Sequence, residues 1–337
     1  MKFPKDLLGI KDLDADQISE ILKTAKIMKE IIVNNNKKAP HLQGKTVITL
    51  FYENSTRTRL SFELASKYLS ANAANVAVAS SSVAKGESLI DTARTINMMG
   101  TDALVIRHEC AGAPHLVAKN VNASVINAGD GMNEHPTQAL LDAYTMIEQK
   151  GKIEGLKVAI CGDVLHSRVA RSNIYLLNKL GAEVSLCAPT TLMPPEIEKL
   201  NVKTYTDVEK AIKGADVIMG LRIQLERQKK GLFPSIDEYS DLFGINEERL
   251  KLAKEDAIIL HPGPVNRGVE ITSGIYSHER SCIDTQVTNG VAVRMAVLYL
   301  LSRRSIWLHT VWKQKFPLIS QKFLRTYESI ILEISLS

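Results

Sequence analysis

The chain has few cysteines for its 337 residues, and they are scattered: Cys110, Cys161, Cys187 and Cys282. No two of them form a C-x-x-C pair. Four scattered cysteines in a chain of this length fit buried thiols in a reducing compartment, not a disulfide framework or a zinc site. We expect reduced thiols, a cytoplasmic protein and no metal site.

The glycine-rich loops that bind nucleotides are also missing. Gly162 stands alone after a predicted strand, where a dinucleotide fingerprint needs three glycines, and there is no G-x-x-x-x-G-K-[ST] segment. No apolar run is long enough to cross a bilayer, and the N-terminus, charged from Lys2 onward, has no signal-peptide core. We therefore expect no cofactor and no membrane partner.

Net positive charge is scarce outside the C-terminus. The formal net charge is +5, but residues 303–337 hold six Lys and Arg against two Glu, which leaves +1 for the rest of the chain. A body this close to neutral is not expected to bind nucleic acid.

What the chain does contain is a regular alternation of short apolar runs with helical patterns, which follows an amphipathic helix within residues 1–40. The predicted strands are 46–51, 76–78, 103–106, 123–126, 156–160, 183–186, 215–219 and 257–260. The predicted helices are 60–69, 88–99, 113–120, 137–149, 168–180, 207–213, 246–254 and 285–302. This order predicts an α/β fold with mainly parallel sheets and crossover helices, and a long polar connection over 225–245.

A polar, glycine-bearing break over 151–155 divides the two series of elements. We predict two similar-sized domains, each a mainly parallel sheet flanked by helices, with the active site in the cleft between them. The expected parts are 1–149, 150–285, a helix over 286–302 that packs back on the first domain, and a tail over 303–337. Ligands of open parallel sheets bind beyond the carboxyl ends of the strands, so the loops that follow strands are the candidate site.

The segment Ser55-Thr56-Arg57-Thr58-Arg59 lies between a predicted strand and a predicted helix. Free backbone N–H groups and the helix dipole favour an anion at such a turn. Hydroxyl donors and two guanidinium groups add further hydrogen-bond donors, and the segment contains no acidic residue, so we expect no acid close to it. The segment therefore predicts a phosphate site. An ordinary Ser/Thr cap with solvated arginines explains it equally well when it is taken alone.

Other polar side chains follow the remaining strands. Lys85 lies in a serine-rich loop over 80–88, Arg107 ends a strand, and His135-Pro136-Thr137-Gln138 opens a helix with the proline at the first helical position. In the second half, the residues that follow strands are Arg168, Arg222, Gln224 and the turn His261-Pro262-Gly263-Pro264, in which Gly263–Pro264 is a candidate cis peptide.

These loops together supply five cations with few carboxylates: Arg57, Lys85, Arg107, Arg168 and Arg222. One phosphate does not need five cations. The set predicts two polyanionic ligands, one on each domain, held for a reaction in which charge develops.

These motifs, in this order, resemble the transcarbamoylases over about residues 1–302. The serine-lysine loop, Arg222-Ile223-Gln224 and His261-Pro262-Gly263-Pro264-Val265-Asn266-Arg267-Gly268 are similar to the aspartate branch of that family. The resemblance implies transfer of the carbamoyl group from carbamoyl phosphate to L-aspartate, which gives N-carbamoyl-L-aspartate and phosphate in the committed step toward pyrimidines.

The resemblance also implies a role for each motif residue. The phosphate would be held by Ser55, Thr56, Arg57 and Thr58. The carbamoyl group would be held by Arg107, His135, Gln138 and the backbone at Gly263 and Pro264. L-aspartate would be held by Arg168, Arg222, Gln224 and Lys85. The residues implied to act in catalysis are Thr58, Arg107, His135 and Lys85. In the family, Ser82 and Lys85 enter the site of the neighbouring subunit, which implies a homotrimer.

Two alternatives remain open at this stage. An ornithine carbamoyltransferase shares the first-domain motifs, but a cationic acceptor side chain disfavours Arg222 near its end, and Thr137 stands where that branch carries a cysteine. A catalytically silent homologue would bind carbamoyl phosphate without turnover. Partner regulatory chains are compatible with the resemblance, and nothing in the sequence decides on them.

The resemblance ends near Leu301. The tail over 303–337 holds both tryptophans, most of the net charge and Pro317, which interrupts any single helix there. We interpret it first as the product of a shifted reading frame. An amphipathic segment that binds a membrane or a partner, and a genuine structural extension, are the alternatives.

Overall fold

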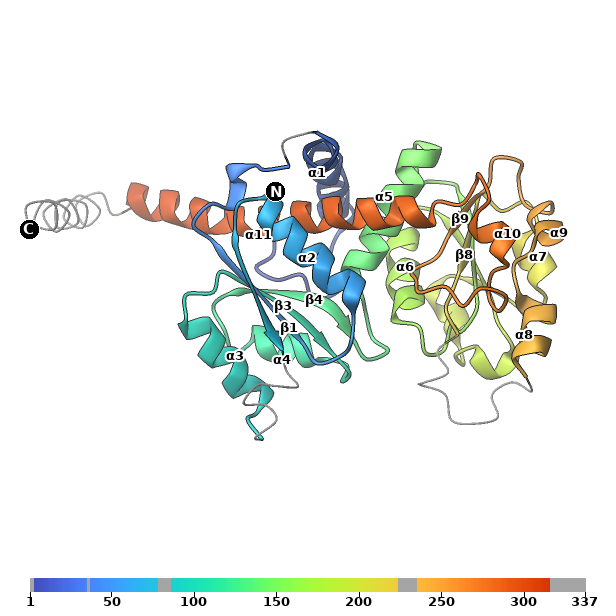
Figure 1. Ribbon diagram of the computed structural model, residues 1–337, viewed down its shortest axis with the longest axis horizontal. Helices are drawn as coiled ribbons and strands as arrows, with labels where there is room; N and C mark the ends of the chain where they lie inside the picture. The colour runs from blue at the N-terminus through green and yellow to red at the C-terminus, as the bar shows by residue number, and fades with distance from the viewer. Residues whose placement is uncertain (1–2, 35–36, 78–85, 224–234, 316–337) are drawn as a thin grey trace, which may run out of the picture.

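The computed structural model describes residues 3–34, 37–77, 86–223 and 235–315 of the chain. Two sheets stand side by side, each with helices on both faces (Figure 1). This is the α/β architecture that the alternation of elements predicts.

The first sheet has four parallel strands in the order β2-β1-β3-β4. They are β1 (Thr46–Phe51), β2 (Asn72–Ala77), β3 (Ala103–His108) and β4 (Ser124–Asp130). One face carries α3 (Leu89–Met98) and α4 (Ala113–Ala118). The other face carries α1 (Ala15–Val33), α2 (Thr56–Tyr68), α5 (Pro136–Lys150) and the long C-terminal helix α11 (Ile283–Lys315).

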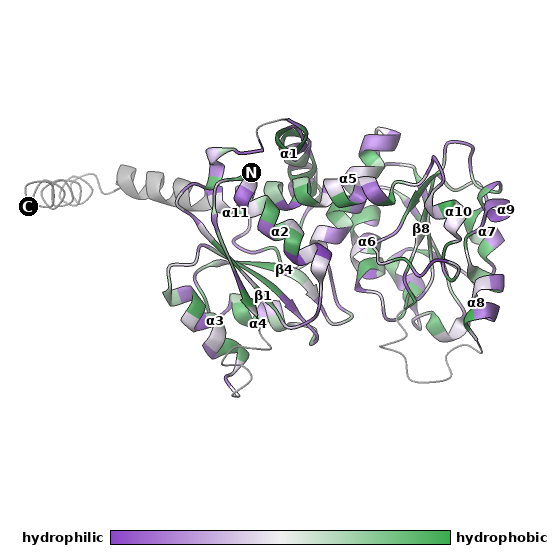
Figure 2. Cartoon of the chain, in the orientation of Figure 1, coloured by the Kyte–Doolittle hydropathy of each residue, from purple (hydrophilic) through white to green (hydrophobic). Residues whose placement is uncertain are grey.

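The second sheet has five parallel strands in the order β7-β6-β5-β8-β9. They are β5 (Lys157–Cys161), β6 (Glu183–Cys187), β7 (Lys203–Tyr205), β8 (Val217–Gly220) and β9 (Ile258–Leu260). The helices around it are α6 (Arg168–Lys179), α7 (Val208–Ile212), α8 (Ile236–Phe243), α9 (Glu247–Leu250) and α10 (Ser273–Tyr276). The strands of both sheets are mostly hydrophobic, as expected for parallel sheets covered on both faces (Figure 2).

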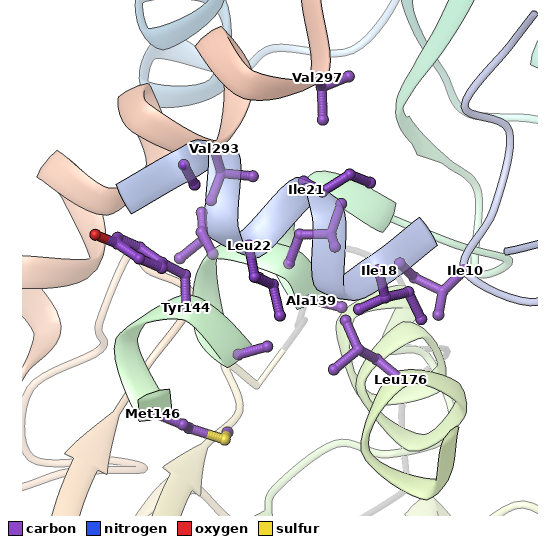
Figure 3. Packing of buried hydrophobic residues seen from close by; sticks show 14 of the residues in the cluster. Ile10, Ile18, Ile21, Leu22, Ala139, Tyr144, Met146, Leu176, Val293 and Val297 are labelled. Atoms are coloured by element: carbon purple, nitrogen blue, oxygen red, sulfur yellow. The ribbon is translucent and has the colours of Figure 1, made fainter. Parts of the chain in front are cut away.

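A layer of helices joins the two halves. Ile18 and Ile21 of α1 are completely buried in one cluster with Val293 of α11. Leu176 of α6 reaches this cluster from the second half and lies beside Ile18 (Figure 3). Each large apolar side chain buried in this way contributes about 1.5–3 kcal/mol. Because α11 starts beside β9 and then packs on α1 and α2, it anchors the second half to the first.

The structure departs from the predicted elements in several places: α10 (Ser273–Tyr276) was not predicted, and β2 starts at Asn72 rather than at 76. The connection over 225–245 contains α8, which starts after Ser235 because the hydroxyl of that residue accepts a hydrogen bond from the backbone N–H of Glu238 at 3.1 Å. Buried Tyr239 packs this short helix against the second half. The helix was not predicted because its sequence is mostly polar. Strand β7 was not predicted, and α11 continues to Lys315 rather than ending at 302. None of the helices in the described part of the chain is both long and apolar enough to cross a membrane.

Candidate active site

A cleft of about 850 Å³ opens between the two sheets, at the carboxyl ends of their strands. Its wall includes every described residue that the sequence predicted for the site: Ser55, Thr56, Arg57, Thr58, Arg107, His135, Gln138, Arg168, Arg222, Gly263 and Pro264. Ser82, Lys85 and Gln224 lie outside the described residues. The parallel topology explains the convergence, because each of these side chains follows or ends a strand that points toward the cleft.

The Ser55–Thr58 segment forms the first turn of α2, as predicted. Ser55 is the N-cap residue with extended backbone, but its hydroxyl makes no capping hydrogen bond within the described chain. Thr58 is buried, and both residues line the cleft. The α2 N-terminus therefore presents backbone N–H groups and hydroxyl groups to the cleft instead of using its serine as a cap.

Arg57 lies where the two halves meet. Burial lowers the pKa of Arg57, and the positive charge of nearby Arg222 lowers it further. A Cβ atom added at Gly263 would come within 2.8 Å of the Arg57 Cζ atom, so the turn after β9 touches this guanidinium group. Gly263 has φ +63°, and Gly263–Pro264 is cis, as the sequence suggested. Two repelling cations at one edge of a cleft are stabilised when an anion lies between them.

The prediction that no acid lies close to the phosphate segment is wrong. Glu53, two residues before Ser55, accepts a hydrogen bond from Arg107 Nε at 3.0 Å and forms an ion pair with Arg168 through the same Oε2 atom. One carboxylate in the β1–α2 loop therefore links an arginine of the first half to an arginine of the second. The sequence analysis passed over Glu53 because nothing in its spacing shows which cations it meets.

His135 is the N-cap residue of α5, with Pro136 at the first helical position, as predicted. Its backbone N–H donates to Ser172 Oγ at 2.9 Å, and its ring is buried. Burial lowers the pKa of His135 well below its ordinary value, and the charges of Arg107, Arg294 and Arg168 lower it further. Its Nδ1 atom has no hydrogen-bond partner among the described residues. The cleft therefore contains a neutral imidazole, which can donate one N–H group.

Arg294 of α11 is a cleft residue that sequence reasoning missed. Its Nη1 donates to Ser61 Oγ at 2.9 Å, and its guanidinium group lies 5.2 Å from the centre of the Phe62 ring. Burial lowers the pKa of Arg294 to about 10, and the charge of Asp142 opposes that shift. The residue lies in the helix over 286–302, for which the sequence predicted only packing on the first domain.

Among the described residues, no group of three His, Cys, Asp or Glu could hold a metal ion.

Two family models match the chain. The carbamoyl-phosphate-binding domain of the aspartate/ornithine carbamoyltransferases matches residues 5–148, and the Asp/Orn-binding domain matches residues 154–301. The tail beyond 301 lies outside both.

Individual relatives agree with the models. The aspartate carbamoyltransferase catalytic subunit of Acetivibrio thermocellus is 72% identical over 300 residues, which cover 89% of this chain and 96% of that protein. The corresponding subunit of Ruminiclostridium cellulolyticum is 68% identical, with 90% and 96% covered.

Solved structures of both branches of this family share the fold of the chain. Aspartate transcarbamoylase from Trypanosoma cruzi, in complex with N-(phosphonacetyl)-L-aspartic acid, matches with a TM-score of 0.81 and 30% identity over 88% of this chain and 95% of that one. Ornithine carbamoyltransferase from Pyrococcus furiosus matches with a TM-score of 0.78 and 32% identity over 88% and 96%. The chain therefore belongs to the aspartate/ornithine carbamoyltransferase family, and within it to the catalytic subunits of aspartate carbamoyltransferase.

Proposed function

We propose that the chain transfers the carbamoyl group of carbamoyl phosphate to the amine of L-aspartate and releases N-carbamoyl-L-aspartate and phosphate. The observation that carries the proposal is the cleft, where Arg57 and Arg107 from the first half face Arg168 and Arg222 from the second. Arginines on both walls suit a reaction between two anions. The high identity to aspartate carbamoyltransferase catalytic subunits supports the same acceptor, and this reaction is the committed step of pyrimidine synthesis.

The donor side follows from the α2 N-terminus. The phosphate of carbamoyl phosphate would lie against the first turn of α2, where Ser55, Thr56 and Thr58 supply hydroxyl and backbone donors and Arg57 supplies a guanidinium group. The carbamoyl group would then point toward Arg107, His135 and Gln138, and toward the backbone at Gly263 and Pro264, which are the other walls of the same cleft.

The acceptor side follows from the second half. Arg168 and Arg222 would hold the two carboxylates of aspartate, with Gln224 beside them. The cationic side chain of ornithine would be repelled by Arg222. Solved ornithine enzymes match the fold about as well as aspartate enzymes, so fold alone does not separate the two acceptors. Identity to these solved enzymes does not separate them either, at 30% for the aspartate enzyme and 32% for the ornithine enzyme. The relatives of 72% and 68% identity, both catalytic subunits of aspartate carbamoyltransferase, favour aspartate.

The chemistry needs no nucleophile from the protein. The aspartate amine attacks the carbamoyl carbon, a C–N bond forms, and the carbonyl oxygen gains negative charge in a tetrahedral intermediate. Collapse of the intermediate breaks the C–O bond to phosphate, which leaves with its electron pair and takes the amine proton. Thr58, Arg107 and the neutral imidazole of His135 are the donors for the oxyanion, and removal of one such donor typically costs about 100- to 1,000-fold in rate.

Lys85 and Ser82 belong to the same proposal. We place them in the site of a neighbouring subunit, where Lys85 would help to bind aspartate, and so propose a homotrimer with sites between subunits. Regulatory partner chains are compatible with this assembly. If Lys85→Ala and Arg168→Ala chains are each inactive, mixing them should restore part of the activity, because some sites would then receive only intact residues. Independent sites within each chain would give no recovery.

The remaining proposals concern organisation. We propose a carbamoyl-phosphate domain over 1–149, an aspartate domain over 150–285, and a returning helix over 286–302, as supported by the extents of the two family matches. We propose that the tail over 303–337, which lies outside both matches, derives from a shifted reading frame. The cysteines, none of which forms a disulfide here, fit a cytoplasmic enzyme.

The test compares Arg57→Gln with Arg222→Gln in steady-state assays of carbamoyl-aspartate formation. Arg57→Gln should raise the KM for carbamoyl phosphate, and Arg222→Gln should raise the KM for aspartate. Loss of one hydrogen bond to a charged group typically costs about 1.5–3 kcal/mol, so each increase should be roughly tenfold or more. Equal effects on both substrates in both variants would contradict the two-wall assignment.

A further inference from the structure

We propose that Asp142 is a positioning residue for recognition of the carbamoyl donor. It turns the amide oxygen of Gln138 toward the cleft and, through Gln286, fixes the turn after β9. The inference rests on the proposed function, because it concerns the carbamoyl amine that Gln138 and this turn are proposed to meet.

Asp142 lies on α5 and is completely buried. Its Oδ1 atom accepts hydrogen bonds from Gln138 Nε2 at 2.9 Å and from Gln286 Nε2 at 2.7 Å. Its Oδ2 atom accepts from Asn173 Nδ2 at 2.8 Å. Gln286 Oε1 in turn accepts from the backbone N–H of His261 at 2.9 Å. One carboxylate thus connects three helices with the first residue of the His261-Pro262-Gly263-Pro264 turn.

Hydrogen-bond chemistry fixes the direction of each amide. An ionised carboxylate only accepts, so Gln138 and Gln286 must both present their NH₂ groups to Asp142. The backbone N–H of His261 only donates, so it needs the oxygen of Gln286, which is the atom that remains. The two hydrogen bonds of the Gln286 amide, one from its NH₂ group and one to its oxygen, therefore require the same orientation. For Gln138, the atom that remains for the cleft is the oxygen, an acceptor.

The network also explains how a buried carboxylate keeps its charge. Burial raises the pKa of Asp142 to about 6, while hydrogen bonds from Asn173, Gln286 and Gln138, and the charge of Arg294, oppose that shift. The carboxyl group is therefore ionised at neutral pH. A protonated Asp142 would offer a donor to one of the amides and release its orientation.

The consequence is selectivity between donors of the same shape. The NH₂ of carbamoyl phosphate can donate to the Gln138 oxygen, and the turn that Gln286 holds would supply further acceptors. Acetyl phosphate places a methyl group there and leaves a largely buried acceptor without a partner. An unpaired buried polar group typically costs enough to reduce affinity by roughly tenfold to a hundredfold. Asp142 preserves this discrimination by preventing Gln138 from turning its NH₂ to the methyl side.

The test removes the acceptor at position 142. In Asp142→Leu, a side chain of similar size accepts no hydrogen bond, so the NH₂ groups of Gln138 and Gln286 lose their partner and Gln138 can turn. Asp142→Asn is the conservative variant. Its amide oxygen can still accept from Gln138 and Gln286, and only its NH₂ group, which lies against the NH₂ group of Asn173, is unfavourable.

The measured quantity is the inhibition constant of acetyl phosphate divided by the dissociation constant of carbamoyl phosphate, with inorganic phosphate as the reference ligand. We expect the ratio to fall roughly tenfold in Asp142→Leu and to stay near that of the wild type in Asp142→Asn, while phosphate binding stays unchanged. Asn173→Ala is the matched control. It removes a partner of Asp142 but leaves the bond to Gln138, so the ratio should stay near that of the wild type.

Three outcomes would overturn the inference: an unchanged ratio in Asp142→Leu, a ratio lowered as much by Asn173→Ala, or an equal loss of phosphate binding in Asp142→Leu, which would show that the substitution damages the whole site. If Asp142→Leu does not fold, Gln286→Leu decides, because it removes the link between Asp142 and the turn after β9 and should lower the ratio in the same direction. An unchanged ratio there also contradicts the inference. Absence of carbamoyl transfer by the wild type would instead refute the proposed function.

Discussion

Replacement of Gly263 by alanine should separate function from stability. The new Cβ atom would lie 2.8 Å from Cζ, 3.0 Å from Nη1 and 3.1 Å from Nη2 of Arg57. These contacts are too close, but the crowded atoms are the end of a flexible side chain, so the guanidinium group can move away. Movement relieves the clash and at the same time takes Arg57 from its proposed place on the phosphate.

The two effects have different sizes. A non-glycine residue in the left-handed region costs roughly 1–2 kcal/mol, and Gly263 has φ +63°. Gly214 has φ +68° and no atom beyond its chain neighbours within 4 Å of its added Cβ, so Gly214→Ala carries a comparable cost for positive φ without the clash. Loss of one hydrogen bond to a charged group costs about 1.5–3 kcal/mol, which corresponds to a roughly 10- to 150-fold weaker interaction with carbamoyl phosphate.

The assay combines urea unfolding with steady-state kinetics on both variants. We expect Gly263→Ala and Gly214→Ala to lose similar free energies of unfolding, while only Gly263→Ala raises the KM for carbamoyl phosphate. An unchanged KM in Gly263→Ala would refute the contact between the turn and a functional Arg57. A free-energy loss far above that of Gly214→Ala would show that the guanidinium group cannot move.

Four further predictions concern other parts of the cleft, the pH dependence of stability and the tail. Glu53→Gln should raise the KM for aspartate roughly tenfold or more, because the neutral amide no longer holds Arg107 and Arg168 together; wild-type kinetics would contradict this. His135→Ala should lower kcat about 100- to 1,000-fold. The depressed pKa of His135 means that wild-type protein loses stability as pH falls below about 6.5, and an NMR titration of this imidazole centred near 6.5 would count against it. A chain that ends at Arg304 should keep full activity, and a large loss would show that the tail contributes.

The sequence predicted the fold and most of the cleft because the signals were local. Strands of β-branched residues followed by helical stripes identify parallel sheets, and the strand ends then mark the ligand edge. The Ser55–Thr58 segment, His135 and the Gly263–Pro264 turn were found in this way, since each combines an element boundary with side chains that do not serve packing.

The residues that the sequence did not reveal depend on tertiary contacts. Glu53 is one acid among many until the fold brings it to Arg107 and Arg168. Arg294 and Asp142 lie within apolar helix patterns, where a single charged residue usually indicates an exposed position. Only the crossing of α5 and α11 shows that both are buried near the cleft. Contacts between residues that are far apart in the sequence leave no periodic pattern, so they cannot be predicted from one sequence alone.

The most direct test of the central claim is carbamoyl transfer from carbamoyl phosphate with L-aspartate and L-ornithine offered in parallel to the purified full-length chain. The account predicts N-carbamoyl-L-aspartate and phosphate in equal amounts, and no citrulline. Citrulline as the main product would leave the donor side standing and contradict the assignment of Arg168 and Arg222 to aspartate. No product from either acceptor, in a folded protein that binds carbamoyl phosphate, would contradict the proposed activity.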